Sequence, residues 1–261
     1  MIFEHLRRLI AYRGLLWNLA LAELKARHRQ TTLGMLWAIA QPLSMMVVTT
    51  IVFSMFVRLS DESMPYAIVA YVGLWTWLLF ANSLTASMSS IVANMNLVTK
   101  ANFPREVIPL SKIVVTGFDF LVGLVFLGLL MAFYRVPLTA SVLIVPGLLL
   151  IQGAIIVGMM LLCSALYVLH RDLGALLPLG LQVLMLLSPV LYPVSLVPEQ
   201  VKSLYLLNPM AALIEAYRAA LLYGQFPNLG SLAGALLAAV VLFGLGYQYF
   251  KSVEQRFADV M

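Results

Sequence analysis

The chain has 261 residues, of which 62% are hydrophobic and only 10% are charged, and its formal net charge is +5. This composition excludes a soluble globular protein of the same length, because such a fold would need a charged surface that the sequence does not contain. Lipid accepts apolar side chains on the outside of a molecule, so we expect an all-α integral membrane protein.

The first 30 residues predict an amphipathic, basic helix that lies in the membrane interface. Apolar residues recur at helical spacing from Leu6 to Leu24, while Arg7 and Arg8 fall on other faces. Asn18 interrupts the apolar run and more charge follows it, so this segment is not expected to be a cleaved signal sequence.

Six later runs are long enough to cross a bilayer, since a spanning helix needs about 20 mostly apolar residues. The six transmembrane helices are expected over residues 34–57, 66–93, 113–134, 142–169, 175–192 and 229–250. The apolar stretch "SLYLLNPMAALI" is too short to cross and is broken by Asn208 and Pro209. We therefore expect short re-entrant or gating helices in the outer segment 195–228. The whole chain, 1–261, is expected to form one membrane domain.

Basic residues predict the orientation, because short loops rich in lysine and arginine stay in the cytoplasm. With both termini inside, four basic residues lie outside, and they are Arg58, Arg135, Lys202 and Arg218. The other twelve lie inside, and they are Arg7, Arg8, Arg13, Lys25, Arg27, Arg29, Lys100, Arg105, Lys112, Arg171, Lys251 and Arg256. This bias predicts that both termini and the segment 94–112 are cytoplasmic.

The segment 94–112 gathers charge and two prolines in a chain that otherwise avoids charge. Within "NFPREVIPL", Asn102 can cap a helix, Pro104 fits its first turn, and Glu106 lies near the positive end of its dipole. We therefore expect a short cytoplasmic helix that presents Phe103, Arg105 and Glu106 to a partner. The alternative is an ordinary loop whose basic residues only set the orientation.

The sequence lacks the patterns of a catalyst. It contains no phosphate-binding loop of the form G-x-x-x-x-G-K-[ST] and no Ser/His/Asp set or paired carboxylates at catalytic spacing. The chain is therefore not expected to hydrolyse nucleotide or to be an enzyme by itself. His5, His28 and His170 are scattered without the spacing of metal ligands, so no metal site is expected.

Two polar features inside the apolar sequence have simple structural explanations. The stretch "HRDLG" begins like a kinase catalytic loop, but Leu177 stands where that loop requires asparagine. We expect an inside turn there, with Arg171 and Asp172 able to pair in water or against a partner. Asp119 is the only charged residue well inside an expected span, and it can lean toward the headgroups. Because ion-coupled carriers use buried charges, this shortage points to an external motor.

Six sequence blocks together resemble the permease subunit of type-2 ABC exporters. In chain order they are "AELKARHRQTTLGMLWAIAQPL", "NLVTKANFPREVIPLSK", "HRDLG", "LSPVLYP", "LNPMAALIEAYR" and "FKSVEQRFADVM". The blocks cover nearly the whole chain and most resemble the branch that exports lipid-linked polysaccharide such as O-antigen, capsule or teichoic acid. His28 and His170 depart from the pattern, because they stand where aromatic residues, chiefly tyrosine, are expected.

The resemblance implies a homodimeric permease in the bacterial inner membrane, with two copies of a separate cytoplasmic ATPase. The ATPase would bind ATP and Mg, so no cofactor is expected in this chain, and no nucleic acid is expected as a partner. The resemblance also implies an interface helix at 1–30, a coupling helix within 94–112 and gating helices within 195–228. The residues expected to couple to the ATPase are Asn102, Phe103, Pro104, Arg105, Glu106, Arg171 and Asp172.

Two groups of residues are candidates for contact with a lipid-linked glycan. Arg7, Arg8 and Arg13 would meet a headgroup phosphate at the cytoplasmic surface, although ordinary anionic lipid would attract them equally. Aromatic rings can stack on sugar rings, and the rings expected along the path are Tyr192, Tyr205, Trp75 and Tyr217. The alternative for these rings is an interfacial aromatic belt.

Two other functions stay open at the level of sequence. One is export of a drug or another small hydrophobic molecule by the same kind of permease. The other, of a different class, is an ion-coupled carrier or channel that works without an ATPase.

Overall fold

The computed structural model describes residues 11–29, 37–55, 64–194, 197, 200, 205 and 207–257. Each element over these residues is a helix, which confirms the predicted all-α fold. The predicted positions of Arg7 and Arg8 lie outside the described residues.

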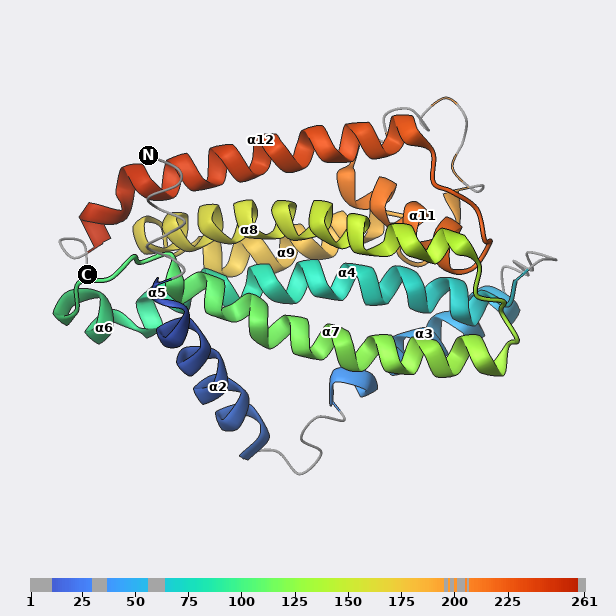
Figure 1. The fold of residues 1–261 in the computed structure, drawn as a ribbon, viewed down its shortest axis with the longest axis horizontal. Coiled ribbons are helices and arrows are strands. Elements are labelled where there is room, and N and C mark those ends of the chain that lie inside the picture. The colour runs from blue at the N-terminus through green and yellow to red at the C-terminus, as the bar shows by residue number, and fades with distance from the viewer. Residues whose placement is uncertain are drawn as a thin grey trace.

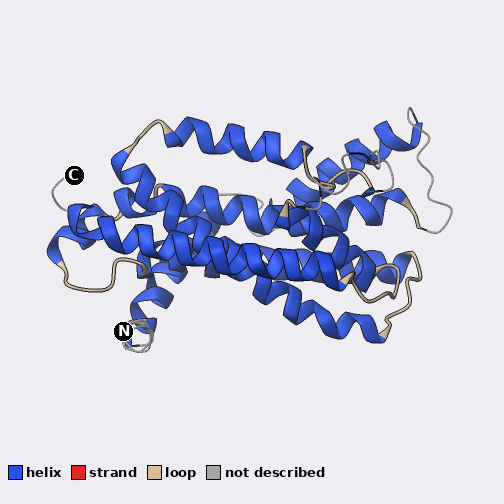
Figure 2. Cartoon of the chain, turned by 90° about the horizontal axis from the view of Figure 1, so that it is seen from above, coloured by secondary structure: helices blue, strands red, loops and turns tan. Residues whose placement is uncertain are grey.

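The helices form an elongated bundle. In chain order they are α2 (Arg13–Arg29), α3 (Trp37–Met55), α4 (Tyr66–Met88), α5 (Ser90–Ala93), α6 (Met95–Lys100), α7 (Val107–Phe133), η2 (Ala140–Ile144), α8 (Val145–Leu169), α9 (Leu173–Leu186), α11 (Pro209–Leu221), α12 (Leu229–Val253) and η4 (Glu254–Arg256). Figure 1 shows α4, α7, α8 and α12 along the long axis, with α2 leaving the bundle at an angle. Figure 2 shows the same bundle after a quarter turn, as helices joined by loops.

Four helical stretches are long and apolar enough to cross a membrane. They are Tyr66–Met88, Val107–Phe133, Ala140–Leu169 and Leu229–Arg256. Two shorter apolar helices, Ile39–Val52 and Leu173–Leu186, coincide with the first and fifth expected spans. The 14 residues of α9 extend about 21 Å, which is less than a hydrocarbon core of about 30 Å. The chain is therefore a multi-pass membrane protein, and six spans remain a prediction.

The expected separate helix over "NFPREVIPL" is wrong. Residues 101–106 form turns, and α7 begins at Val107, which is earlier than the expected start of the third span. The reason is burial. The apolar residues Val107, Ile108 and Pro109 are enclosed by protein, so they form the first turn of α7 and not a separate helix. The short helices of this region are α5 and α6, which precede the turns.

The main hydrophobic core is built around α4. Of the most apolar stretch of this helix 78% is buried, against 17% for α12, so α4 is central and α12 leaves most of its apolar surface for lipid. A second, smaller cluster lies where α5, α6, the start of α7, the last turns of α8 and the end of α12 meet. Its buried members are Ile91, Val98, Ile108, Leu161, Ala165, Val168, Phe250, Val253 and Phe257.

The helices α8 and α12 touch backbone to backbone. A Cβ atom added to Gly246 would lie 2.0 Å from the main-chain oxygen of Gly158. A Cβ atom added to Gly158 would lie 2.4 Å from the oxygen of Leu242. Glycine at both positions therefore permits the close contact, as small residues do between membrane helices.

The bundle has two distinct ends. The loop end holds α5, α6, the turns at 101–106, the turn between α8 and α9, and the end of α12 (Figure 1). The α11 end holds α11 and the turn that follows α9. The predicted site residues divide between these two ends.

Candidate functional site

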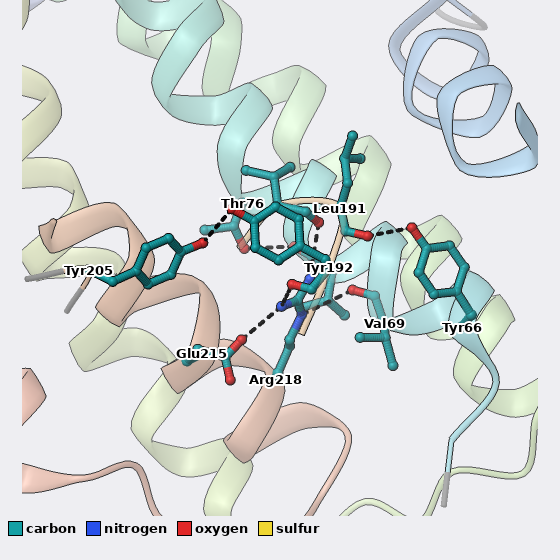
Figure 3. Close-up of polar contacts among 10 residues, drawn as sticks. Tyr66, Val69, Thr76, Leu191, Tyr192, Tyr205, Glu215 and Arg218 are labelled. Carbon is teal, nitrogen blue, oxygen red and sulfur yellow. Dashed lines mark hydrogen bonds and ion pairs between the residues drawn. The ribbon is translucent and has the colours of Figure 1, made fainter. Parts of the chain in front are cut away.

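Arg218 is the centre of the α11 end. Only 1% of its surface is exposed, although arginine is always charged. Its guanidinium donates to the main-chain oxygens of Val69 at 3.1 Å, Val190 at 3.0 Å and Tyr192 at 3.2 Å. It also pairs with Glu215 at 2.8 Å, and Figure 3 shows these contacts converging on the side chain.

This arrangement ties three segments together. Val69 belongs to α4, Val190 and Tyr192 belong to the turn after α9, and Arg218 belongs to α11. A buried guanidinium is costly unless its donors are satisfied, so the contacts form one interdependent set. We call Arg218, Glu215 and the three carbonyls the arginine clamp.

A glycine on α4 makes room for the clamp. A Cβ atom added to Gly73 would lie 2.2 Å from the oxygen of Val190 and 2.7 Å from Nη2 of Arg218. Any larger residue would push the turn or the guanidinium away from α4. The tight approach therefore depends on both Gly73 and Arg218.

Two sequence motifs of the α11 end are joined by a hydrogen bond. The side-chain oxygen of Asn208 accepts from the backbone N–H of Met210 at 3.0 Å and so caps the start of α11. The amide of the same side chain donates to Oγ of Ser188 at 2.8 Å. The "LNP" stretch before α11 is thus held against the "LSPVLYP" turn after α9.

Two of the candidate path residues, Tyr192 and Tyr205, lie next to each other. The hydroxyl of Tyr205 donates to the hydroxyl of Tyr192 at 2.9 Å, and Tyr192 donates to the oxygen of Leu186 at 2.8 Å. The ring centroids are 6.4 Å apart, and both side chains are partly buried (Figure 3). Burial raises the pKa of Tyr205, so its hydroxyl remains a donor. Tyr66 also donates to the oxygen of Leu191 in the same turn.

Trp75 and Tyr217 lie deeper. Trp75 is 3% exposed, donates to the oxygen of Phe120 at 2.9 Å and stacks on that ring. Tyr217 is fully buried and donates to Gln152 at 2.9 Å, which in turn donates to the oxygen of Thr76. Within the single chain these two rings are covered by protein, whereas Tyr192 and Tyr205 are only partly buried. Their role along a path stays a prediction.

At the loop end, Arg105 and Glu106 were expected to face a partner, but both contact other parts of the chain. Glu106 is 1% exposed and lies 2.6 Å from Nζ of Lys251, near the end of α12. Within the single chain the carboxylate is therefore enclosed beside Lys251 and is not at the surface as expected, and its role in coupling to an ATPase stays a prediction. Arg105 is partly buried and donates to the main-chain oxygen of Glu254.

The other residues of these turns are more open. Asn102 is exposed, and its main-chain oxygen accepts from the hydroxyl of Tyr12 at 3.3 Å. Phe103 packs against the second hydrophobic cluster, and Pro104 is partly buried. The surface left for a partner is thus formed by Asn102 and the edges of its neighbours.

The expected turn at Arg171 and Asp172 is present between α8 and α9. Both side chains are exposed, and the guanidinium of Arg171 lies 5.2 Å from the ring centroid of Tyr167. Asp172 occupies the position just before α9. The turn is at the loop end, as are residues 101–106 (Figure 1).

Arg13 is the first residue of α2, and its side chain is exposed. An ion pair between Glu23 and Lys112 joins α2 to α7. The expected helix is therefore present over the described part of the N-terminal segment, and its place in the membrane interface remains a prediction. In the ranges that the structure describes, no group of three or more His, Cys, Asp or Glu side chains could hold a metal ion.

The sequence analysis missed Arg218, Lys251 and Glu254. Each takes part in a pair spaced three residues along a helix, Glu215 with Arg218 and Lys251 with Glu254. Opposite charges at this spacing face each other on a helix, and this was the available signal.

The chain has clear likenesses to known proteins. The profile of a family described as ABC-2 type transporter matches residues 14–222. The chain is 34% identical over 256 residues to the O-antigen export system permease protein RfbA of Myxococcus xanthus, covering 97% of both. It is 28% identical over 240 residues to the protein of that name from Klebsiella pneumoniae, covering 92% of both. It is 22% identical over 245 residues to the polysialic acid transport protein KpsM of Escherichia coli, covering 91% of this chain and 92% of that protein.

Proposed function

Because the chain belongs to the ABC-2 type transporter family, we propose that it is the membrane-spanning subunit of an ATP-driven polysaccharide exporter. One observation carries this function: over 97% of its length the chain is similar to an O-antigen export permease. The all-helical bundle supports this proposal, because four of its helical stretches are long and apolar enough to cross a membrane. The energy comes from a separate ATPase, which would bind ATP and Mg outside this chain.

In the proposed arrangement the loop end is cytoplasmic and both termini are inside the cell. The bias of basic residues supports this orientation, because the turns at 101–106, the turn at Arg171 and the end of α12 all lie at one end of the bundle (Figure 1). Two permeases and two ATPases would assemble in the inner membrane. In that assembly α3 and α9 would complete the six spans, since both expose apolar surface in the single chain.

The proposed substrate is a lipid-linked, O-antigen-like glycan, which passes from the loop end to the α11 end. Arg13, with Arg7 and Arg8, would attract its phosphate at the cytoplasmic surface. Tyr192 and Tyr205 would offer sugar rings a partly exposed aromatic contact at the exit. The arginine clamp would hold these rings in place.

Reconstitution tests this function directly. The chain, purified with its ATPase in proteoliposomes, should move a phosphorylated lipid-linked glycan across the bilayer only with hydrolysable ATP. Accumulation of a small hydrophobic drug without glycan movement would instead support the drug-export alternative. Transport by the chain alone, driven by a proton gradient, would refute the proposal in favour of an ion-coupled carrier.

A further inference from the structure

The end of α12 is joined to the turns at 101–106 by charged contacts. Nζ of Lys251 lies 2.6 Å from Oε1 of Glu106 and 3.0 Å from Oε2 of Glu254. Arg105 donates to the main-chain oxygen of Glu254. These contacts connect two segments that are far apart in the sequence, namely the stretch that precedes α7 and the stretch that ends α12.

The position of Glu106 makes the contact with Lys251 important. The side chain of Glu106 is 1% exposed, whereas those of Lys251 and Glu254 are 21% and 24% exposed. A buried carboxylate is costly without a cation beside it, and here Lys251 is that cation. Glu254 is partly exposed and only three residues from Lys251, so it can pair with Lys251 whether or not Glu106 is present.

Apolar packing joins the same two segments. Ile108 at the start of α7 and Phe250, Val253 and Phe257 at the chain's C-terminal end are buried in the second hydrophobic cluster. Phe103 packs against that cluster, and the rings of Phe250 and Phe257 meet edge to face at 5.5 Å. The charged contacts therefore lie beside an apolar contact and not on an isolated surface.

We infer that Arg105, Glu106, Lys251 and Glu254 form a joint that makes the turns at 101–106 and the end of α12 move as one body. A displacement of these turns by the ATPase would then reach α12 directly, and not only α7, which follows them in the chain. From α12 it would reach α8 through the backbone contact at Gly158 and Gly246. Lys251 is a positioning residue in this joint, and the inference rests on the proposed function.

Neutralising both members of the buried pair tests the joint. The variant E106Q/K251M removes the ion pair without leaving a buried charge unpaired, so it should fold and assemble with the ATPase. We expect a loss of glycan exported per ATP of about fivefold or more, which is the lower end of coupling between sites. The matched control is Arg256→Gln, which removes an exposed cation of the same segment and should export normally.

Charge reversal supplies the rescue. In E106K/K251E the buried position again lies beside an opposite charge, and we expect export per ATP to return. Native export per ATP in E106Q/K251M would overturn the joint. Export that stays low in the reversed pair, or a neutral pair that fails to assemble, would make these residues folding contacts only and would also overturn it.

A distance measurement tests the motion itself. Ala101 and Gln255 are exposed and lie beside the joint, so spin labels at both positions on a Cys163→Ser background report its geometry. The inter-label distance in the assembled complex should be the same with and without ATP, and should change in E106Q/K251M. An inter-label distance that changes on addition of ATP in the protein without the E106Q/K251M substitutions would overturn the inference. If the native complex exports no glycan at all, the proposed function fails instead, and the two failures are distinguishable.

Discussion

The arginine clamp at the α11 end and the joint at the loop end both place a charge out of water, but they satisfy it differently. Arg218 donates mainly to main-chain oxygens, whereas Glu106 is balanced by another side chain, Lys251. Main-chain acceptors cannot be mutated away, so the clamp needs the forked guanidinium itself. The joint needs only opposite charges, so its two partners can be removed or exchanged together. This difference predicts opposite outcomes for paired substitutions at the two ends.

Of the substitutions considered, Arg218→Met should lower the stability of the protein most. Methionine leaves the oxygens of Val190 and Tyr192, which lie outside a helix, without the guanidinium donor, and each buried acceptor without a donor costs about 1–3 kcal/mol. We expect the free energy of unfolding to fall by about 4 kcal/mol, as for other broken buried charge contacts. This loss of stability can be measured with a thiol-reactive dye during heating in detergent, because the buried thiol of Cys163 reacts only when the protein unfolds. Arg218→Lys should recover less than half, because an ammonium cannot reach three carbonyls in a fork. A native melting curve for Arg218→Met would contradict the clamp.

Lys251→Met should cost about 3 kcal/mol, because it leaves the carboxylate of Glu106 buried without a cation. Adding Glu106→Gln should recover most of that loss, measured by the same thiol reaction. The corresponding pair at the other end, R218M/E215Q, should recover little beyond Arg218→Met, since the carbonyls stay unpaired. Equal recovery at both ends would remove the distinction between clamp and joint.

Gly73→Ala tests the clamp from the side of α4. The added methyl group would lie 2.2 Å from the oxygen of Val190, so the turn must shift. Overpacking of this kind costs about 1–3 kcal/mol. Gly117→Ala in α7 is the matched control, because nothing lies within 4 Å of its added Cβ atom. The control should be neutral or should gain up to about 1 kcal/mol from higher helix propensity. Equal melting temperatures for the two variants would show that the turn yields freely.

Hydrophobic runs predicted the positions of the helices well, because burial in lipid or protein acts on each run by itself. The start of α7 and the end of α9 were less predictable, because distant segments determine them. Residues 107–109 are buried at the start of α7, with Ile108 in the second cluster, and α9 ends before the turn whose carbonyls accept from Arg218. Neither partner is adjacent in sequence.

The candidate sites were predictable only in part for the same reason. The break predicted at Asn208 and Pro209 is present, because α11 begins at Pro209 with Asn208 as its cap. The acceptors of Arg218 are main-chain oxygens, which every residue carries, so no residue type in the sequence identifies them. Glu106 was expected to face a partner protein because nothing near it in the sequence indicated a contact inside the chain. Its actual partner, Lys251, is distant in sequence.

Tyr205 gives the smallest predicted effect on stability and separates the ring from its hydroxyl. Tyr205→Phe removes the bond to Tyr192 and should cost only about 1 kcal/mol, the value of one neutral hydrogen bond. If sugar rings stack on the aromatic face, this variant should export glycan normally, because the face remains. Tyr205→Ala should lower export while ATP hydrolysis by the complex persists, and the clamp, which does not use this side chain, should stay intact. Normal export by Tyr205→Ala would place the ring in an interfacial belt, whereas equal losses in both variants would assign the effect to the hydroxyl.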